Sequence, residues 1–192
     1  MTAHRSPDGG SSSPARGDGD AFETFYRTTV QRTFDIARRA AAGDKHLAHD
    51  ATQDAYVEML RRWDERRDRC PQDNRRYVVA IAVHKVLDWY RRRGRLTPLC
   101  DDHDQAQEDA GFAEVLDKLS VLQLVRDLIS RQPPARRAVA VLVFLEDLGY
   151  DEVARILEID TSTVRTQVHR LRQMLKPAVD HAMDSEQAGE WS

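Results

Sequence analysis

The spacing of apolar and polar positions along the chain predicts a succession of amphipathic helices. From Ala21 onward, apolar side chains recur three and four residues apart, which places them on one face of a helix. Gly43 is expected to end this helix, because glycine readily adopts the left-handed conformation that closes many helices. The apolar stripe of the first helix consists of Phe22, Phe25, Tyr26, Val30, Phe34 and Ala37.

Two more helical patterns follow, from about residue 46 to 63 and from about residue 77 to 93. A polar stretch that contains Pro71 separates them. The segment 96–112 then carries five acidic residues and no lysine or arginine, and it also contains proline and glycine. This composition is typical of a linker rather than of a packed element.

The second half of the chain returns to helical periodicity near Val115, with a break at Pro133 and Pro134. No stretch shows the alternation of a strand. We therefore predict an all-α fold of two small helical domains joined by a flexible acidic linker, with a helix-turn-helix near the C-terminus. The predicted limits are a disordered N-terminal tail at 1–20, a first domain at 21–95, the linker at 96–114, a second domain at 115–178 and a frayed C-terminal tail at 179–192.

The predicted helix-turn-helix lies in the stretch "DEVARILEIDTSTVRTQVHRLRQMLK", which starts at Asp151. Gly149 and Asp160 are suited to begin its two helices as N-caps. At 100° per residue, one side of the second helix is apolar and the opposite side is polar and rich in hydrogen-bond donors. The apolar stripe is Val164, Val168, Leu171 and Leu175, and the opposite face carries Ser162, Thr166, His169 and Gln173 with Arg165 and Arg170 at its flanks.

A polar helix face of this kind suits insertion into the major groove of DNA, where side chains meet base edges and arginines reach phosphates. An ordinary surface helix also has a polar face, so this alternative stays open on the motif alone. Glu158 stands in the turn where many helix-turn-helix sequences carry glycine for a positive φ. The turn is therefore expected either to differ in shape or to hold Glu158 under modest strain.

Composition narrows the chemistry further. Of the 192 residues, 32% are charged and the net charge is only −3, which excludes a uniformly basic surface but allows local patches. Cys70 and Cys100 stand without a CxxC or Cys/His cluster, so neither a disulfide framework nor a zinc site is predicted. His46 and His49 share a helix face without a third ligand, and we expect no metal, no cofactor and no catalytic site. Without an apolar run of about 20 residues, no membrane insertion is expected and the protein is predicted to be cytoplasmic.

Two stretches of the first domain carry candidate surfaces. The stretch "HDATQDAYVEMLRRW" places acidic and amide side chains beside one exposed apolar residue, a face that is either solvated or docks a basic partner helix. The stretch "YVVAIAVHKVLDWYRRRGR" ends in aromatic residues and an arginine run, which is typical of nucleic-acid binding. Trp89 continues the apolar spacing of its helix and is expected to pack in the core.

The order of these parts resembles bacterial RNA polymerase sigma factors of the extracytoplasmic-function (ECF, group 4) type, over residues 21–178. The resemblance implies a non-catalytic specificity subunit that binds the polymerase core enzyme and promoter DNA. Its first domain, region 2, would bind the β′ clamp helices and would recognise and melt the −10 element. Its second domain, region 4, would bind the −35 element as duplex and touch the β flap. Linkers of the family thread through the polymerase channel, and an anti-sigma factor is a common additional partner.

The resemblance assigns site residues by position. The family's Ala-Glu-Asp-x-x-Gln-Glu run is matched from Ala48, with His49 in place of the first glutamate. In the family's IARNxxxDxxRRxxR pattern, Val83 and His84 replace arginine and asparagine, and in the recognition helix Gln167 replaces an arginine that could bind phosphate. The implied core polymerase-binding residues are Asp50, Gln53, Asp54 and Val57. The implied −10 residues are Asn74, Arg75 and Arg76, as a pocket for a flipped base, with His84, Lys85, Tyr90, Arg91, Arg92 and Arg93. The implied −35 residues are Ser162, Thr163, Arg165, Thr166, His169 and Arg170.

Two rival functions remain from the sequence. One is a stand-alone DNA-binding regulator that uses only the helix-turn-helix, and it leaves the arginine run at 91–95 unexplained. The other is an adaptor that docks on polymerase without reading DNA. Substitution of Arg165, His169 and Arg170 would then leave promoter choice unchanged.

Overall fold

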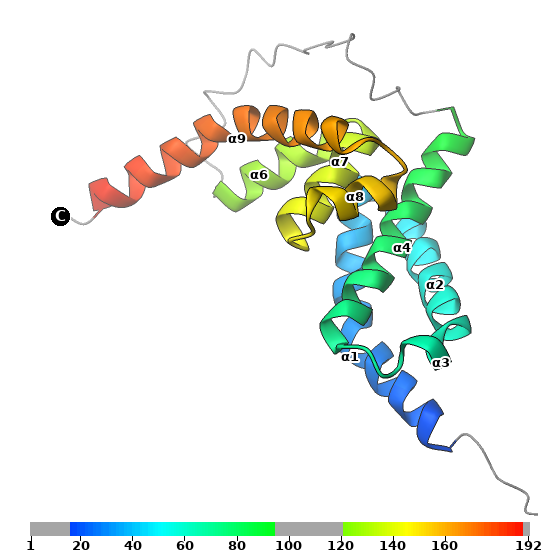
Figure 1. Cartoon of the computed structure of the whole chain (residues 1–192). Helices are drawn as coiled ribbons and strands as arrows, with labels where there is room; N and C mark the ends of the chain where they lie inside the picture. The colour runs from blue at the N-terminus through cyan, green and yellow to red at the C-terminus, as the bar shows by residue number, and fades with distance from the viewer. Residues whose placement is uncertain (1–15, 95–120, 190–192) are drawn as a thin grey trace, which may run out of the picture.

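The computed structural model describes residues 16–94 and 121–189, and all regular elements in these ranges are helical (Figure 1). The predicted all-α class is confirmed. The predicted linker at 96–114 lies outside the described residues. The first group of helices is α1 (Arg16–Ala40), α2 (Lys45–Arg61), α3 (Trp63–Arg66) and α4 (Pro71–Arg92). The second group is α6 (Val121–Ser130), α7 (Pro134–Ala140), the π-helical turn η1 (Val141–Leu145), α8 (Tyr150–Leu157) and α9 (Thr161–Gly189).

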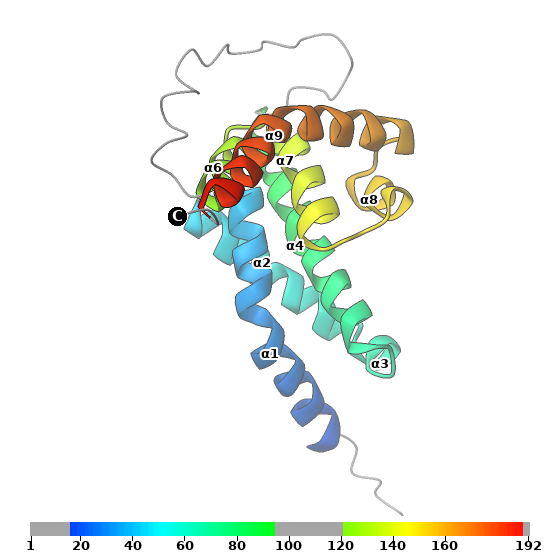
Figure 2. The same cartoon turned by 90° about the vertical axis from the view of Figure 1, so that its left-hand side faces the viewer.

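The first group is a bundle in which α1, α2 and α4 pack against one another (Figures 1 and 2). Alanines at the helix contacts, such as Ala37, Ala48 and Ala82, are fully buried and let the backbones approach closely. At the far end, the Trp63 ring lies 5.2 Å from Phe22 and 5.4 Å from Phe25, between centroids. These aromatic contacts close the bundle where α3 turns the chain from α2 to α4.

Most of the helix ends that the sequence predicts are found in the structure. Gly43 has φ of 90° and its amide donates to the Arg38 carbonyl at 2.8 Å, which ends α1 as expected. The break between α6 and α7 falls at the predicted prolines, where Pro133 is the N-cap and Pro134 the first residue of α7. Gly149 is the N-cap of α8. Glu158 has φ of 56° and ψ of 46°, so the turn keeps the left-handed geometry and Glu158 bears the strain.

Three predicted boundaries differ from the structure. The helix α1 already begins at Arg16, within the segment expected to be a tail. The helix α4 begins at Pro71 rather than near Tyr77, because proline is favoured at the first helical position, where its missing N–H has no helical partner. The helix α9 continues through the exposed Pro177 to Gly189, beyond the predicted end of the second domain. A proline breaks only local backbone hydrogen bonding, and an exposed helix can continue past it.

The two groups pack against each other and share one continuous buried cluster. Helices α7 and α8 lie against α4, and α7 and η1 lie against α1 (Figure 2). The buried guanidinium of Arg137 in α7 donates to the carbonyl of Ala40 at the end of α1, at 2.7 Å. Burial lowers the pKa of Arg137, and the nearby Tyr90 ring, 5.4 Å away, partly offsets this. The sequence predicted two domains but gave no indication of this interface.

A buried hydroxyl cluster in the first group offers a test of the packing. The Tyr56 hydroxyl lies 2.7 Å from the Thr29 hydroxyl and 3.1 Å from that of Thr33. Burial raises the pKa of Tyr56 above its usual value near 10, although both threonine hydrogen bonds lower it. The stabilisation from protonated Tyr56 is therefore complete below about pH 10 and is lost as the pH rises through the raised pKa.

We expect Tyr56→Phe to lower the free energy of unfolding at neutral pH by about 1 kcal/mol, because two buried threonine oxygens lose a partner. The variant should also lose less stability above pH 10 than the wild type, because it lacks the buried phenol. Urea denaturation at pH 7 and pH 11 measures both effects. The control is Tyr26→Phe, since Tyr26 is 41% exposed. Equal changes in both variants would contradict the role of the cluster.

Candidate functional site

The exposed face of α9 gathers the side chains predicted to read DNA. Ser162, Arg165 and His169 are exposed, and Thr163, Thr166 and Arg170 are half-buried beside them. Behind them, the apolar stripe of the same helix is buried against α6, α7 and α8. Neither Arg165 nor Arg170 forms an ion pair with any residue that the structure describes. Both guanidinium groups can therefore bind an external anion without breaking an internal contact.

Gln167 lies on the buried side of α9, away from the exposed face. Only 1% of its surface is exposed, and its side-chain oxygen accepts a hydrogen bond from Arg136 Nε at 2.6 Å. The sequence interpretation of Gln167 as a lost phosphate contact is therefore wrong. The position belongs to the internal packing between α7 and α9.

The turn before α9 fixes the direction of the recognition helix. The Thr161 hydroxyl donates to the Asp151 carboxylate at 2.9 Å, which ties the start of α9 to the start of α8. The Ile159 amide donates to the Ala154 carbonyl at 3.0 Å and closes the end of α8. These contacts hold the left-handed conformation at Glu158, which costs roughly 1–2 kcal/mol for a residue with a Cβ.

A second cationic surface lies on α3 and α4 and faces α8 across a cleft. Cationic side chains outnumber the four carboxylates that line this cleft, of which Glu58 pairs with Arg62 at 2.9 Å. The Arg66 guanidinium lies 3.6 Å over the Tyr77 ring. Burial, and next the charge of Arg69, lower the pKa of Arg66. A cluster of like charges beside an aromatic ring is suited to a strand of nucleic acid, whose phosphates neutralise the cations. The cationic residues that line the cleft are Arg62, Arg66, Arg69, Arg76, Lys85 and Arg155, with His84 among them.

The structure separates the predicted −10 residues by environment. Arg92 and Arg93 are exposed at the end of α4, and the Arg93 guanidinium lies 4.1 Å over the Trp89 ring. Asn74 is 2% exposed and donates to the Arg66 carbonyl at 2.9 Å, a place that favours a structural role over direct contact with a base. Tyr90 is half-buried, and its hydroxyl donates to the Ala41 carbonyl at 3.3 Å.

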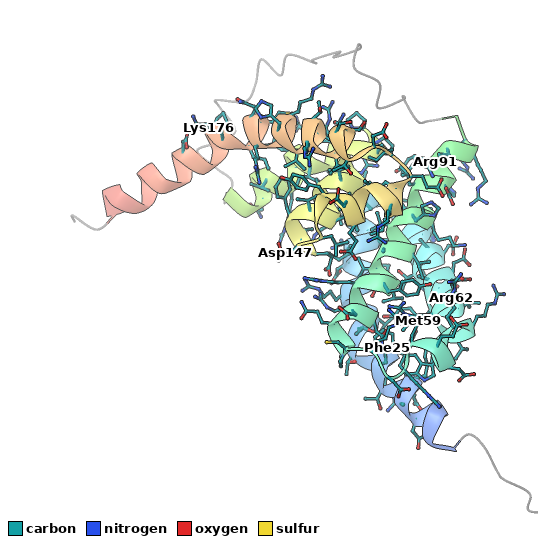
Figure 3. The ribbon with its side chains drawn as sticks, viewed as in Figure 1. Phe25, Met59, Arg62, Arg91, Asp147 and Lys176 are labelled. Atoms are coloured by element: carbon teal, nitrogen blue, oxygen red, sulfur yellow. The ribbon has the colours of Figure 1, made fainter. Side chains whose placement is uncertain are left out.

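Three other −10 candidates contact the second group of helices. Arg75 forms an ion pair with Glu146 at 3.0 Å. Arg91 pairs with Asp88 at 3.1 Å and also donates to the Leu157 carbonyl at 2.9 Å, at the end of α8 (Figure 3). His84 lies 3.3 Å from Asp88 and 3.8 Å from Glu158.

A third surface runs along α2. The predicted docking residues Asp50, Gln53, Asp54 and Val57 are all exposed on this helix. Of these, Gln53 and Val57 line an apolar groove between α1 and α2, whereas Asp50 and Asp54 do not. In this groove Tyr26 is 41%, Val57 49% and Leu60 55% exposed. The sequence interpretation placed Tyr26 in the apolar stripe of the first helix and overlooked Leu60, although Leu60 stands three residues after Val57 on the same helix face. Exposed apolar side chains beside acidic ones suit the docking of a partner helix with basic residues.

Other site types find no support among the described residues. No group of three or more His, Cys, Asp or Glu side chains lies close enough to hold a metal ion in this part of the chain. Within the same ranges, none of the helices has the length and apolar content needed to cross a membrane.

Comparison with known proteins matches both helical groups. A family model for "Sigma-70 region 2" matches residues 25–96, and a model for "Sigma-70, region 4" matches residues 122–175. The chain is 28% identical to "ECF RNA polymerase sigma factor SigE" of Mycolicibacterium smegmatis, over 81% of this chain and 60% of that protein. It is 26% identical to "RNA polymerase sigma-E factor" of Streptomyces avermitilis, over 86% of this chain and 89% of that protein. It is also 26% identical to "RNA polymerase sigma factor YlaC" of Bacillus subtilis, over 87% of this chain and 96% of that protein.

The geometry of α9 predicts that Arg165 contributes one phosphate contact. We expect Arg165→Ala to weaken binding of the isolated protein to a mixed-sequence DNA duplex, and to reduce the slope of log affinity against log salt by about 0.9. Fluorescence anisotropy at several salt concentrations measures the slope. Arg61→Ala is the matched control, because its side chain is 73% exposed on α2, away from this face. A slope that is the same in both variants would contradict the contact.

Proposed function

The chain belongs to the ECF type of RNA polymerase sigma factors, and we propose that it binds the polymerase core enzyme and directs it to the promoters of a specific set of genes. The observation that carries this proposal is the presence of three distinct surfaces on one chain. They are the groove between α1 and α2, the cationic face of α3 and α4, and the polar face of α9. A stand-alone regulator needs only the last of them.

The groove between α1 and α2 is the proposed docking surface for the core enzyme, through the β′ clamp helices. Gln53 and Val57 line the groove, and Asp50 and Asp54 are exposed on the same helix next to them in the sequence. Apolar side chains supply buried area, while the carboxylates favour a basic partner and fix its orientation. Region 4 is proposed to touch the β flap as well. An anti-sigma factor is a further candidate partner, since such proteins are common for this family.

The cationic face of α4 is proposed to hold the −10 element. Phosphates would bind Arg91, Arg92 and Arg93, and the cleft that Arg76 lines would receive an unstacked base. Opening a base step costs a few kcal/mol, and capture of the flipped base can offset that cost by binding alone. Sigma factors are non-catalytic subunits of transcription initiation, and no catalytic group is assigned to this chain.

The polar face of α9 is proposed to read the −35 element in the major groove. Ser162, Arg165 and His169 are the exposed residues nearest the start of the helix, which is the part of a recognition helix that meets base edges. The half-buried Thr163, Thr166 and Arg170 would position the helix on the backbone. Because the polymerase and the chromosome share the bacterial cytoplasm, we propose that the protein acts there.

In-vitro transcription tests the proposal. Bacterial core polymerase is incubated with genomic fragments, with and without the protein, and the 5′ ends of the transcripts are sequenced. We expect new start sites that share spaced −35 and −10 motifs. Asp50→Arg should abolish these starts, because an added cation at the docking edge repels a basic partner helix. Asp64→Arg is the matched control, since Asp64 is an exposed acid on α3 outside the groove.

The absence of new starts despite confirmed core binding would favour an adaptor. The absence of core binding would reject the proposal in favour of a stand-alone regulator. Full activity of the Asp50→Arg protein would reject the docking edge on α2 but not the sigma function.

A further inference from the structure

The second group of helices covers part of the surface that is proposed to bind −10 DNA. Arg75, His84 and Arg91 all belong to that surface, and each contacts an oxygen from the second group. The oxygens come from the Glu146 carboxylate, the Glu158 carboxylate and the Leu157 carbonyl, respectively. These are the kinds of acceptor that a DNA phosphate would replace.

Glu146 makes the best-defined of these contacts. Its side chain is fully buried, and one carboxylate oxygen accepts from Arg32 Nε of α1 at 3.0 Å. The other oxygen lies 3.0 Å from Arg75 Nη1 as an ion pair that is not aligned as a hydrogen bond. Arg32 also donates to the Leu145 carbonyl at 3.1 Å. A buried carboxylate needs cationic partners, and both partners of Glu146 belong to the first group.

The π-helical turn η1 directs Glu146 toward the first group. A π-turn adds a residue to the helix and shifts the direction of the side chains that follow it. Glu146 follows η1 immediately, and Asp147 then has φ of 53°. Asp147 is exposed although it is the next residue, so only Glu146 enters the interface.

Glu158 makes a second contact across the interface, which involves two departures from the family pattern. Glu158 replaces the glycine of many helix-turn-helix turns, and His84 replaces the asparagine of region 2. Glu158 lies 3.8 Å from His84 and 4.0 Å from Arg91. Arg91 also binds the C-terminal end of α8, where the helix dipole is negative. The strained glutamate therefore adds negative charge where α4 presents its cations.

This arrangement is incompatible with simultaneous promoter binding. Arg75 and Arg91 cannot bind DNA phosphates while they bind the Glu146 carboxylate and the Leu157 carbonyl. In the structure, α8 also contacts α4 directly. The two groups must therefore separate before DNA can reach this surface of α4.

We propose that the free chain is self-inhibited, with its own region 4 occupying the −10 DNA surface of region 2 and held there by Glu146 and Glu158. The carboxylates act as substitutes for DNA phosphates at Arg75 and near Arg91. This inference rests on the proposed function for the identity of the covered surface. It makes the availability of that surface depend on the equilibrium between closed and open arrangements.

The test compares the full-length double variant Glu146→Gln with Glu158→Gly against wild type. The matched control is the double variant Asp147→Asn with Asp180→Asn, which also removes two negative charges, both from exposed residues. Asparagine tolerates the left-handed conformation of Asp147. Binding to a fluorescent oligothymidylate is measured by anisotropy, and the radius of gyration is measured by small-angle X-ray scattering without polymerase.

We expect the double variant to bind the oligothymidylate roughly tenfold more tightly than the control, because a closed state lowers the apparent affinity by the fraction that is open. Its radius of gyration should exceed that of wild type. Equal affinities for the double variant and the control, with unchanged scattering, would overturn the proposal. If the double variant lost helical circular dichroism, the single variant Glu158→Gly would decide by the same criteria, since glycine relieves the left-handed strain.

The failure of this proposal is distinguishable from failure of the sigma function. Both readouts are made without polymerase, whereas the sigma function is tested by new transcription starts. A closed chain that supports no transcription would leave the interface intact and reject the sigma function. An open wild-type chain that directs transcription would reject the self-inhibition and support the sigma function.

Discussion

A shared apolar cluster joins the two helical groups, and the buried carboxylate of Glu146 is the charged contact at this interface whose partners come only from the first group. The carboxylate lies between Arg32 and Arg75, and its side chain is fully buried from water. Removal of either arginine would leave the buried carboxylate with a single cationic partner, and loss of a partner from a buried ion pair typically costs up to about 3–5 kcal/mol. Separation of the two helical groups costs the Glu146 carboxylate less free energy than removal of an arginine, because Glu146 then becomes hydrated. Arg75 is then also free to bind phosphate. One ion pair then replaces another, but the apolar side chains of the shared cluster lose burial, so opening depends on the free energy that binding of polymerase or DNA supplies.

The Glu146 contact, with the others at this interface, divides the proposed binding surfaces into exposed and covered ones. The groove between α1 and α2 and the polar face of α9 are exposed in the closed arrangement, whereas Arg75, His84 and Arg91 are engaged. On this account the core enzyme can dock first, while the −10 surface becomes available only after region 4 moves away. Such an order would limit binding of the free protein to single-stranded DNA.

Sequence periodicity was sufficient to predict the helices and most of their ends, because both depend on residues that are close together in the sequence. Gly43, Pro133 and Gly149 act locally, and Glu158 reveals its left-handed turn through the glycine that it replaces. The faces of α2 and α9 were also predictable, since burial there follows the helical repeat.

The sequence could not predict contacts between distant segments. Arg32 and Glu146 are separated by 114 positions, and nothing in either local pattern indicates the other. The alignment led to the interpretation of Gln167 as a lost phosphate contact, but its side-chain oxygen accepts a hydrogen bond from Arg136 inside the second group. Pro71 was assigned to a connecting stretch, because proline marks a helix start as readily as a break. Similarly, the burial of Asn74 follows from its contact with the Arg66 carbonyl, which only the folded chain provides.

The most direct test of the account is the distance between regions 2 and 4 in the free protein and on the polymerase. Fluorescent labels would be placed at Arg27 on α1 and at Lys176 on α9 (labelled in Figure 3), both exposed, in a chain whose two cysteines are replaced by serine. The account predicts high energy transfer in the free protein and a large loss of transfer when core polymerase and promoter DNA are added. Low transfer in the free protein, or no change on the polymerase, would contradict it.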